Sequence, residues 1–390
     1  MTIPPYCPST TTPSVCRDEG GVELHGVPED GGLPTVSVIV PTYRYASKLE
    51  PTVRGILDDP AATEVIVVVD GCRDGSLELL ESIRGEDRRV VPMFVEHLGK
   101  SGALSAALER AAGEVVLLLD QDVVAAPGLV SGHAAHHQPG EHLVVLGYMP
   151  TLPDQAPGQV AMLTALYSAE YEAHCRRFEE DPELILRHLW GGNVSLRRDD
   201  CMRVGLDFRY FGHEDQELGI RCLKAGLTGR FDRELLADHH HARDAESFLW
   251  YSKMQGASHW QIHQRHGDLL GRYDLESTLE GMPAVARWLA ALAATPRLGD
   301  PSAALLATLG DLFARVRWAR GESMAYRLAR RVELRTGMAI AMKGRNADLL
   351  RRVSPLRLTL RSDARARSDA RARPGTRPRV GTAHARSRRR

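Results

Sequence analysis

The sequence predicts an α/β fold built on a mainly parallel, doubly wound sheet with helices on both faces. Short apolar runs rich in valine alternate with helical patterns over residues 36–150. The runs are continuous rather than alternating, as expected of strands that are covered on both faces. Strands that alternate with helices along the chain favour parallel pairing, because each crossover helix packs against the sheet.

The apolar runs define the expected strands, which cover 36–42, 64–70, 90–96, 114–120 and 142–148. Helices are expected between them at 47–58, 76–84 and 101–112. In the last of these, Ser101 is a candidate N-cap and Gly113 is a candidate stop.

The pattern changes after residue 150. Residues 158–189 have a helical pattern, and WGGNVSLRR (190–198) indicates a glycine turn followed by a short strand. The stretch 212–229 predicts a helix that opens at Glu214 or Asp215. An extended segment is expected at 231–244, and 245–350 is expected to be helical.

Composition restricts the class of protein. The 390 residues contain no apolar run long enough for a spanning helix, and the first 20 residues do not resemble a secretory signal. The six cysteines form no C-x-x-C pair, which favours scattered reduced thiols. The last 40 residues hold 14 arginines against two aspartates. Such a tail binds anionic membranes or nucleic acid in some proteins. We favour a disordered, solvated extension and expect no specific nucleic acid.

Two carboxylates, Asp120 and Asp122, end the apolar run VVLLLDQD. Period-two alternation places them on the same face, where two anions repel unless a cation lies between them. Carboxylate oxygens suit Mg²⁺ or Mn²⁺, and such ions typically also hold substrate phosphates. A solvated turn is the alternative, since two acids in a turn occur by chance in many chains.

Several predicted strands end in polar residues, among them Thr42, Tyr43 and Asp70. Because ligands of parallel α/β sheets bind beyond the carboxyl ends of the strands, we expect these side chains to share a site with Asp120 and Asp122.

The ordered motifs of residues 36–245 resemble the family 2 glycosyltransferases, which have the GT-A fold. They are VSVIVPTYRY, VVVDGCRDGS, HLGKSGALSAALERAAGEVVLLLDQD, WGGNVSLRR and GHEDQELGIRCLKAG. The resemblance implies a nucleotide-sugar donor, a divalent metal at the D-x-D motif and inversion at the anomeric carbon.

The resemblance also implies roles for individual residues. Around the nucleotide it places Pro41, Thr42, Tyr43, Asp70, Lys100, Gly102 and Asp120. Gly191, Gly192 and Asn193 match the turn below the sugar. Asp122 would bind the metal directly with help from Asp120, Asp215 would be the general base, and Glu214 would orient the acceptor. The chain departs from the usual pattern at His97–Leu98 and Ser105, where asparagines are common.

The chemistry of an inverting displacement independently favours two separated sets of acids. One carboxylate must accept the proton of the acceptor hydroxyl, while a metal stabilises the departing diphosphate on the other side of the sugar. The alternative for Glu214 and Asp215 is a pair of acids favoured by the dipole at a helix N-terminus.

Three consecutive histidines follow Asp238. Imidazole readily completes a metal site begun by carboxylates. HARD (241–244) is similar to a segment of β-1,4-galactosyltransferase-type enzymes, which implies His241 as metal ligand, with His239 second because the two share a face if extended. The alternative is a polar, partly exposed turn. His133, His136 and His137 are expected to be surface residues of a helix.

The predicted organisation follows from the family resemblance. Residues 1–34 form a disordered arm and 35–245 a GT-A domain, divided into a nucleotide-binding half (35–125) and an acceptor and metal half (126–245). A helical extension (246–350) and a disordered arginine-rich tail (351–390) follow.

The predicted function is transfer of a hexose from a nucleotide sugar, with a UDP-sugar favoured, to a hydroxyl of a polysaccharide, a lipid-linked glycan or a natural product, with Mn²⁺ or Mg²⁺ as cofactor. A cytoplasmic location is expected, with membrane contact only peripheral and through the basic tail. One alternative is a non-catalytic protein that binds sugar nucleotides or acts as a scaffold. A nucleotidyltransferase is disfavoured because PTYRYASK replaces its glycine-rich loop. A dinucleotide-dependent oxidoreductase is disfavoured because no G-x-G-x-x-G follows the first strand.

Overall fold

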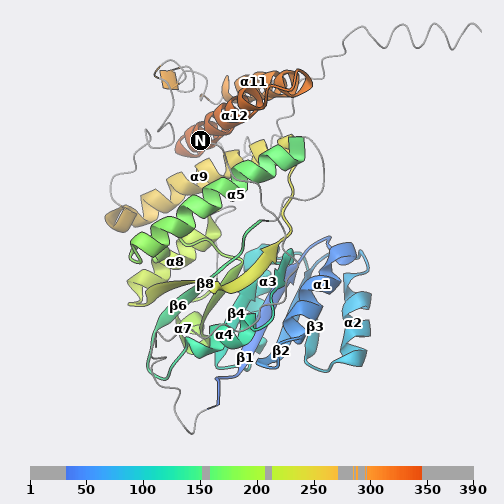
Figure 1. Cartoon of the computed structure of the whole chain (residues 1–390). Coiled ribbons are helices and arrows are strands. Elements are labelled where there is room, and N and C mark those ends of the chain that lie inside the picture. The colour runs from blue at the N-terminus through green and yellow to red at the C-terminus, as the bar shows by residue number, and fades with distance from the viewer. Residues whose placement is uncertain are drawn as a thin grey trace, which may run out of the picture. The chain divides into compact units, whose positions relative to one another are not determined.

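The protein is described from a computed structural model, which covers residues 32–151, 159–206, 213–270 and 297–344, with a few single positions between the last two ranges. Within these residues, eight strands form one sheet in the order β3-β2-β1-β4-β7-β6-β8-β5 (Figure 1). The strands are β1 Val36–Thr42, β2 Ala62–Asp70, β3 Val90–Val95, β4 Val115–Leu119, β5 Val123–Ala125, β6 Leu143–Tyr148, β7 Asn193–Arg197 and β8 Thr228–His239.

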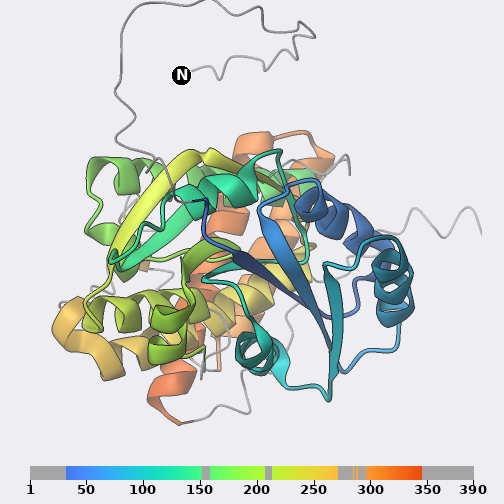
Figure 2. The ribbon, with the colours of Figure 1, turned by 90° about the horizontal axis from the view of Figure 1, so that it is seen from below.

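Helices cover both faces of the sheet, as predicted. They are α1 Ala46–Leu57, α2 Ser76–Glu86, α3 Gly99–Arg110, α4 Leu129–Ala135, α5 Gln159–Glu180, α6 Leu184–Arg187, α7 Arg198–Val204 and α8 Glu214–Lys224. One core joins α1, α2, α4 and α5 to Val38 and Val40 of β1, and the other joins α3, α6, α7 and α8 to Ile39. Figure 2 shows the first strands running between α1 and α2 on one side and α3 on the other.

The parallel strands β3, β2, β1 and β4 bring their carboxyl ends to one edge of the sheet. The strand β7 then runs antiparallel to β4, with Leu119 opposite Asn193. This register places the glycine turn before β7 beside the acids after β4, and the Asp120 N–H donates to the Gly192 carbonyl at 3.2 Å. The sheet is therefore mixed rather than wholly parallel.

The short strand β5 pairs antiparallel with the end of β8, and Val123 lies opposite His239. The backbone N–H of His240 donates to the Asp122 carbonyl at 2.8 Å. Two segments more than 100 residues apart in sequence are thus held side by side, and their side chains meet at the edge where β1 and β4 end.

The helical extension consists, in its described part, of α9 Ala245–Leu270, α11 Gly299–Arg315 and α12 Ala319–Met342. The helices α9 and α12 cross at glycines, since a Cβ on Gly256 would lie 1.8 Å from the Leu334 carbonyl and one on Gly337 1.8 Å from the Lys253 carbonyl. The extension shares a core with Leu163 of α5 (Figure 1).

Most predicted elements form close to their predicted bounds, but three predictions are wrong. Gly113 does not end its helix, because α3 ends at Arg110, and Gly113 instead lies against β1, where a Cβ would be 2.5 Å from the Ser37 nitrogen. Ser101 does not cap its helix, because α3 begins at Gly99 and the Ser101 hydroxyl donates to the Leu206 carbonyl instead. His133 and His137 are buried rather than exposed, since α4 packs against the sheet and both rings bond to the Ser195 hydroxyl.

The predicted arm lies almost wholly outside the described residues, and the predicted tail wholly so. None of the described helices is long and apolar enough to span a membrane. The described cysteines are buried free thiols at 72, 175, 201 and 222.

Candidate active site

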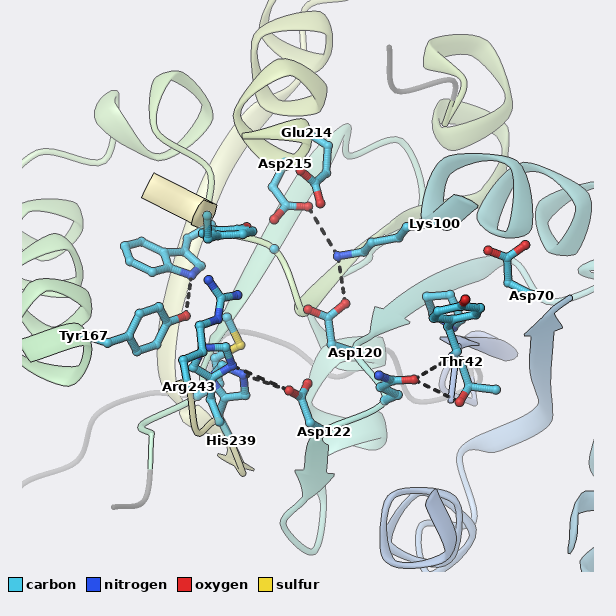
Figure 3. A pocket seen from close by; sticks show the side chains of 18 residues that line it. Thr42, Asp70, Lys100, Asp120, Asp122, Tyr167, Glu214, Asp215, His239 and Arg243 are labelled. Carbon is cyan, nitrogen blue, oxygen red and sulfur yellow. Dashed lines mark hydrogen bonds and ion pairs between the residues drawn. The ribbon is translucent and has the colours of Figure 1, made fainter. Parts of the chain in front are cut away.

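A cavity of 290 Å³ opens at the carboxyl ends of β1, β2 and β4 (Figure 3). It is lined by Pro41, Thr42, Tyr43, Asp70, Lys100, Asp120, Gln121, Asp122, Met149, Tyr167, Trp190, Gly191, Glu214, Asp215, His239, His241, Arg243 and Tyr251. Most of the residues predicted to form the site therefore line one cavity, although they come from segments more than 200 residues apart.

One side of the cavity is formed by the end of β1. Gln121 fixes this strand end, because its side-chain oxygen accepts hydrogen bonds from the Thr42 hydroxyl at 2.9 Å and the Tyr43 N–H at 2.8 Å. The Tyr43 ring remains 40% exposed and tilts against His97 at 5.0 Å between centroids. The partly exposed Tyr43 ring thus lies beside the end of β1, whose backbone is held in place by Gln121.

Asp70 ends β2 and is nearly buried. Its carboxylate accepts the N–H groups of Leu98 and Gly99, at 2.5 and 3.0 Å. These donors open α3, so the carboxylate compensates the positive end of that helix. This contact supplies the N-terminal cap that the sequence had assigned to Ser101.

Lys100 joins two acids that were predicted to have separate roles. Its ammonium lies 2.8 Å from Asp120 Oδ1 and 3.9 Å from Asp215 Oδ1. Burial disfavours the charge of Lys100, but Asp120, Asp215 and Glu214 outweigh burial and hold the pKa of Lys100 well above its usual value. Lys100 is therefore a permanent cation between these carboxylates.

Asp215 lies in the first turn of α8 and lines the cavity. Its removal from bulk water raises its pKa, Lys100 opposes that effect, and the carboxylates of Glu214 and Asp120 add to it, so that the pKa of Asp215 reaches about 7. The neighbouring Glu214 has one buried carboxylate oxygen without a hydrogen-bond partner. Asp215 thus offers a proton-accepting oxygen to the cavity near neutral pH.

Asp122, His239 and His241 form a separate cluster. The Asp122 Oδ2 atom lies 3.6 Å from His239 Nε2 and 3.7 Å from His241 Nδ1. One ligand atom of each residue lies within 4.8 Å of the others. The Thr151 hydroxyl contacts His239 Nδ1 at 3.1 Å, and the Tyr167 ring stacks on His241 at 4.8 Å, so both imidazoles are fixed from behind.

The ionisation of this cluster suits a metal ion. Burial opposes ionisation of Asp122, but hydrogen bonds and charges from His239 and His241 outweigh burial and hold the pKa of Asp122 below its usual range. Burial lowers the pKa of His241, although Asp122 opposes this. An ionised carboxylate beside a neutral imidazole is the state that a divalent cation requires.

The glycine turn before β7 passes close to both acids. A Cβ on Gly191 would lie 2.4 Å from the Asp215 carboxyl carbon. Gly192 has a φ of +109°, and a Cβ there would lie 3.0 Å from Asp120 Oδ2. Only glycine gives the backbone this conformation and this proximity to two carboxylates.

Three residues predicted to contact the donor do not line the cavity. Gly192 instead lines a smaller neighbouring cavity together with Asp120 and Asp215. Gly102 lies inside α3, where a Cβ would meet Leu98. Asn193 is fully buried, and its side chain bonds to His133 Nε2 at 2.8 Å and to the Leu235 carbonyl at 3.0 Å. Asn193 therefore supports the turn from beneath.

Sequence reasoning missed five lining residues, namely Gln121, Met149, Tyr167, Arg243 and Tyr251. Gln121 was signalled by its place between the two acids, and Arg243 by its place in HARD. Tyr167 and Tyr251 lie in helices whose patterns gave no such signal. Trp190, whose role the sequence left open, lines the cavity and donates its Nε1–H to the Tyr167 hydroxyl at 3.2 Å.

Parts of the chain are similar to known proteins. Residues 37–200 match the model of glycosyl transferase family 2. An uncharacterized glycosyltransferase of Bacillus subtilis is 26% identical over 250 residues, which cover 52% of this chain and 64% of that protein. Validoxylamine A glucosyltransferase of Streptomyces hygroscopicus subsp. jinggangensis is 32% identical over 232 residues, which cover 52% of this chain and 54% of that protein. The chain thus spans about half to two thirds of the length of these relatives.

Among solved structures, a mannosyltransferase from Pyrobaculum calidifontis in complex with GDP-Man and Mn²⁺ aligns with a TM-score of 0.49 at 20% identity. The alignment covers 76% of this chain and 86% of that chain.

Proposed function

We propose that this chain, whose residues 37–200 form a glycosyl transferase family 2 domain with the GT-A fold, is a metal-dependent inverting glycosyltransferase. The observation that supports this most directly is the meeting of two acidic groups in one cavity. Asp215 lies on the Lys100 side, and Asp122 lies with His239 and His241 on the other side (Figure 3). An inverting displacement needs both a base and a site for the leaving diphosphate.

Asp215 is the general base of this proposal. Its carboxylate accepts the proton of the acceptor hydroxyl while that oxygen attacks the anomeric carbon opposite the diphosphate. The new carbon–oxygen bond forms as the bond from that carbon to the phosphate oxygen breaks, and the electron pair leaves with the nucleotide. A pKa of about 7 suits this role, because a base is most effective when its pKa lies near the working pH. Glu214 would orient the acceptor.

Asp122, His239 and His241 would hold the divalent cation. The combination of imidazole and carboxylate suits Mn²⁺ better than Mg²⁺, which prefers oxygen ligands alone. Such an ion, when bound, supplies positive charge for the diphosphate. Asp120 remains a predicted ligand, but its nearest cation in this structure is Lys100 at 2.8 Å. Asp120 and Asp122 therefore have different partners in this structure, which are Lys100 for Asp120 and the two histidines for Asp122.

The donor of this proposal is a nucleotide hexose, with a UDP-sugar favoured. Tyr43 and Asp70 would receive the nucleoside, beside the strand end that Gln121 fixes. The sugar would lie over Gly191 and Gly192 against Trp190. The acceptor is a hydroxyl of a glycan, a lipid-linked sugar or a small natural product, and any membrane contact would be peripheral.

The direct test measures release of nucleoside diphosphate from UDP-glucose, UDP-galactose, UDP-N-acetylglucosamine and GDP-mannose, with MnCl₂ or with EDTA. Release that needs Mn²⁺ supports the proposal. The D215N variant should lose about 10²-fold or more in rate while its affinity for the nucleotide stays unchanged. D199N is the matched control, because the Asp199 side chain is 99% exposed on α7.

Two results would contradict the proposal. Turnover that continues in EDTA would remove the metal role of Asp122. Tight nucleotide binding without release from any of the four sugars would favour the non-catalytic alternative.

A further inference from the structure

The helical extension forms part of the catalytic cavity. Tyr251 of α9 lines the cavity together with Asp215. A second cavity of 30 Å³ lies beside the first, between α5, α9 and α12, and its lining includes Leu163, Phe248 and Arg330. Arg243 and Tyr251 line both cavities and so mark the place where they meet. A volume of this size holds about two water molecules, which is roughly the size of a carboxylate.

Arg243 differs from the other cations of this region. Its guanidinium carbon lies 3.7 Å from the centroid of the Tyr251 ring, which fixes the side chain by stacking. Within the described part of the chain no carboxylate pairs with it. By contrast, Lys100 pairs with Asp120, and Arg330 pairs with Glu170 at the far side of the second cavity. Among the described residues that line the two cavities, Arg243 is therefore the cation without a carboxylate partner.

An uncompensated guanidinium that is held in place is a receptor for an anion. Its planar array of N–H donors matches the two oxygens of a carboxylate or a phosphate. A glycosyltransferase site of the proposed kind receives the diphosphate of the donor and, where the acceptor is charged, the anionic group of the acceptor.

The location of Arg243 favours the acceptor. The side chain begins two residues beyond His241 but extends toward the half of the cavity that holds Asp215 (Figure 3). It ends on Tyr251, a residue of the extension rather than of the strand ends that would receive the nucleotide. The acceptor hydroxyl must also lie on this side if Asp215 takes its proton.

We propose that Arg243 binds a carboxylate or phosphate of the acceptor, so that the enzyme selects anionic acceptors such as uronic acid glycosides or sugar phosphates. The identification of this anion as part of the acceptor rests on the proposed function. The binding of an anion at Arg243 does not depend on it.

The test uses two ligands that differ only in charge at one carbon, 4-nitrophenyl β-D-glucuronide and 4-nitrophenyl β-D-glucoside. Their affinities for the full chain with MnCl₂ are measured by calorimetry, and UDP is measured in parallel. The wild type should bind the glucuronide about tenfold or more tightly than the glucoside, and R243Q should lose this preference. R243K should keep part of it, since it retains the charge but not the planar donors. Both variants should bind UDP like the wild type.

The control is R54Q, because Arg54 is an exposed residue of α1 paired with Glu50 and Glu86. A wild type without the preference, or R243Q with the preference intact, would overturn the proposal. If R243Q instead lost affinity for UDP and kept the glucuronide preference, Arg243 would serve the diphosphate. The calorimetric measurement requires no turnover. A failure of the proposed sugar transfer would therefore be detected in the nucleotide-release assay and would not change the outcome of this binding test.

Discussion

Replacing Gly191 by alanine tests whether the position of Asp215 controls the reaction. The added Cβ would lie 2.4 Å from both the carboxyl carbon and Oδ1 of Asp215 and 2.8 Å from Oδ2. Carbon atoms in contact normally lie about 3.5–4.0 Å apart. The carboxylate or the turn must therefore move by about 1 Å.

The size of the effect follows from that displacement. A misplacement of about 1 Å in a reacting group costs on the order of 10²-fold in rate. The crowding itself should cost about 1–3 kcal/mol of stability, because the neighbouring atom is one side chain rather than fixed backbone. The variant should therefore fold but turn over about 100 times more slowly.

The assay compares nucleotide release and sugar transfer by G191A and the wild type, with melting temperatures and UDP affinities measured on the same samples. UDP affinity should be nearly unchanged, because the strand end at Thr42 lies away from the substitution. G85A is the control, since a Cβ at Gly85 in α2 meets nothing within 4 Å. A folded G191A variant with the wild-type rate would refute the role given to Asp215.

Three further predictions concern other parts of the molecule. D122A should lose the rise in melting temperature that MnCl₂ gives the wild type, and a rise that persists would place the ion elsewhere. H133A should lose about 3 kcal/mol in urea unfolding, because it leaves the buried Asn193 Oδ1 without its partner and removes one of the two histidine contacts of the Ser195 hydroxyl, and a loss well below that would contradict the role of this network. Burial raises the pKa of Glu333 to about 8, although Lys253 opposes this and Asp300 adds to it. The stability contributed by protonated Glu333 is thus complete below the usual pKa near 4.5 and is lost as the pH rises through about 8. Melting temperatures from about pH 5 to about pH 9 should fall more steeply for the wild type than for E333Q, and parallel profiles would contradict the shift.

The sequence predicted the sheet because its signals are local. Continuous valine runs such as VSVIVPT fit only strands that are covered on both faces, and the helical patterns between them fit crossovers. Parallel strands end at the same edge, so the placement of Thr42, Asp70 and Asp120 in one region also followed from pattern alone. The motif resemblance then indicated a family, and the family model matches residues 37–200.

The partners of the charged side chains did not follow from pattern. The sequence suggested one cation between Asp120 and Asp122, whereas the structure pairs Asp120 with Lys100 and places Asp122 beside His239 and His241. Alternation along a strand gives the face of a residue but not the atoms that reach it from other elements. The same limit explains His133, whose polar side chain predicted exposure although Ser195 and Asn193 satisfy both ring nitrogens in the interior.

The sequence by itself determined the elements, their order and the edge of the sheet at which polar residues gather, because hydrophobic periodicity and motif spacing act over short stretches of chain. Only the tertiary structure decided that Tyr251 and Arg243 complete the cavity and that Gly191 lies against Asp215. These contacts join residues that are distant in sequence. They depend on how α8 packs against the sheet and α9 packs against α5 and α8, which is set by the whole core and by no single segment.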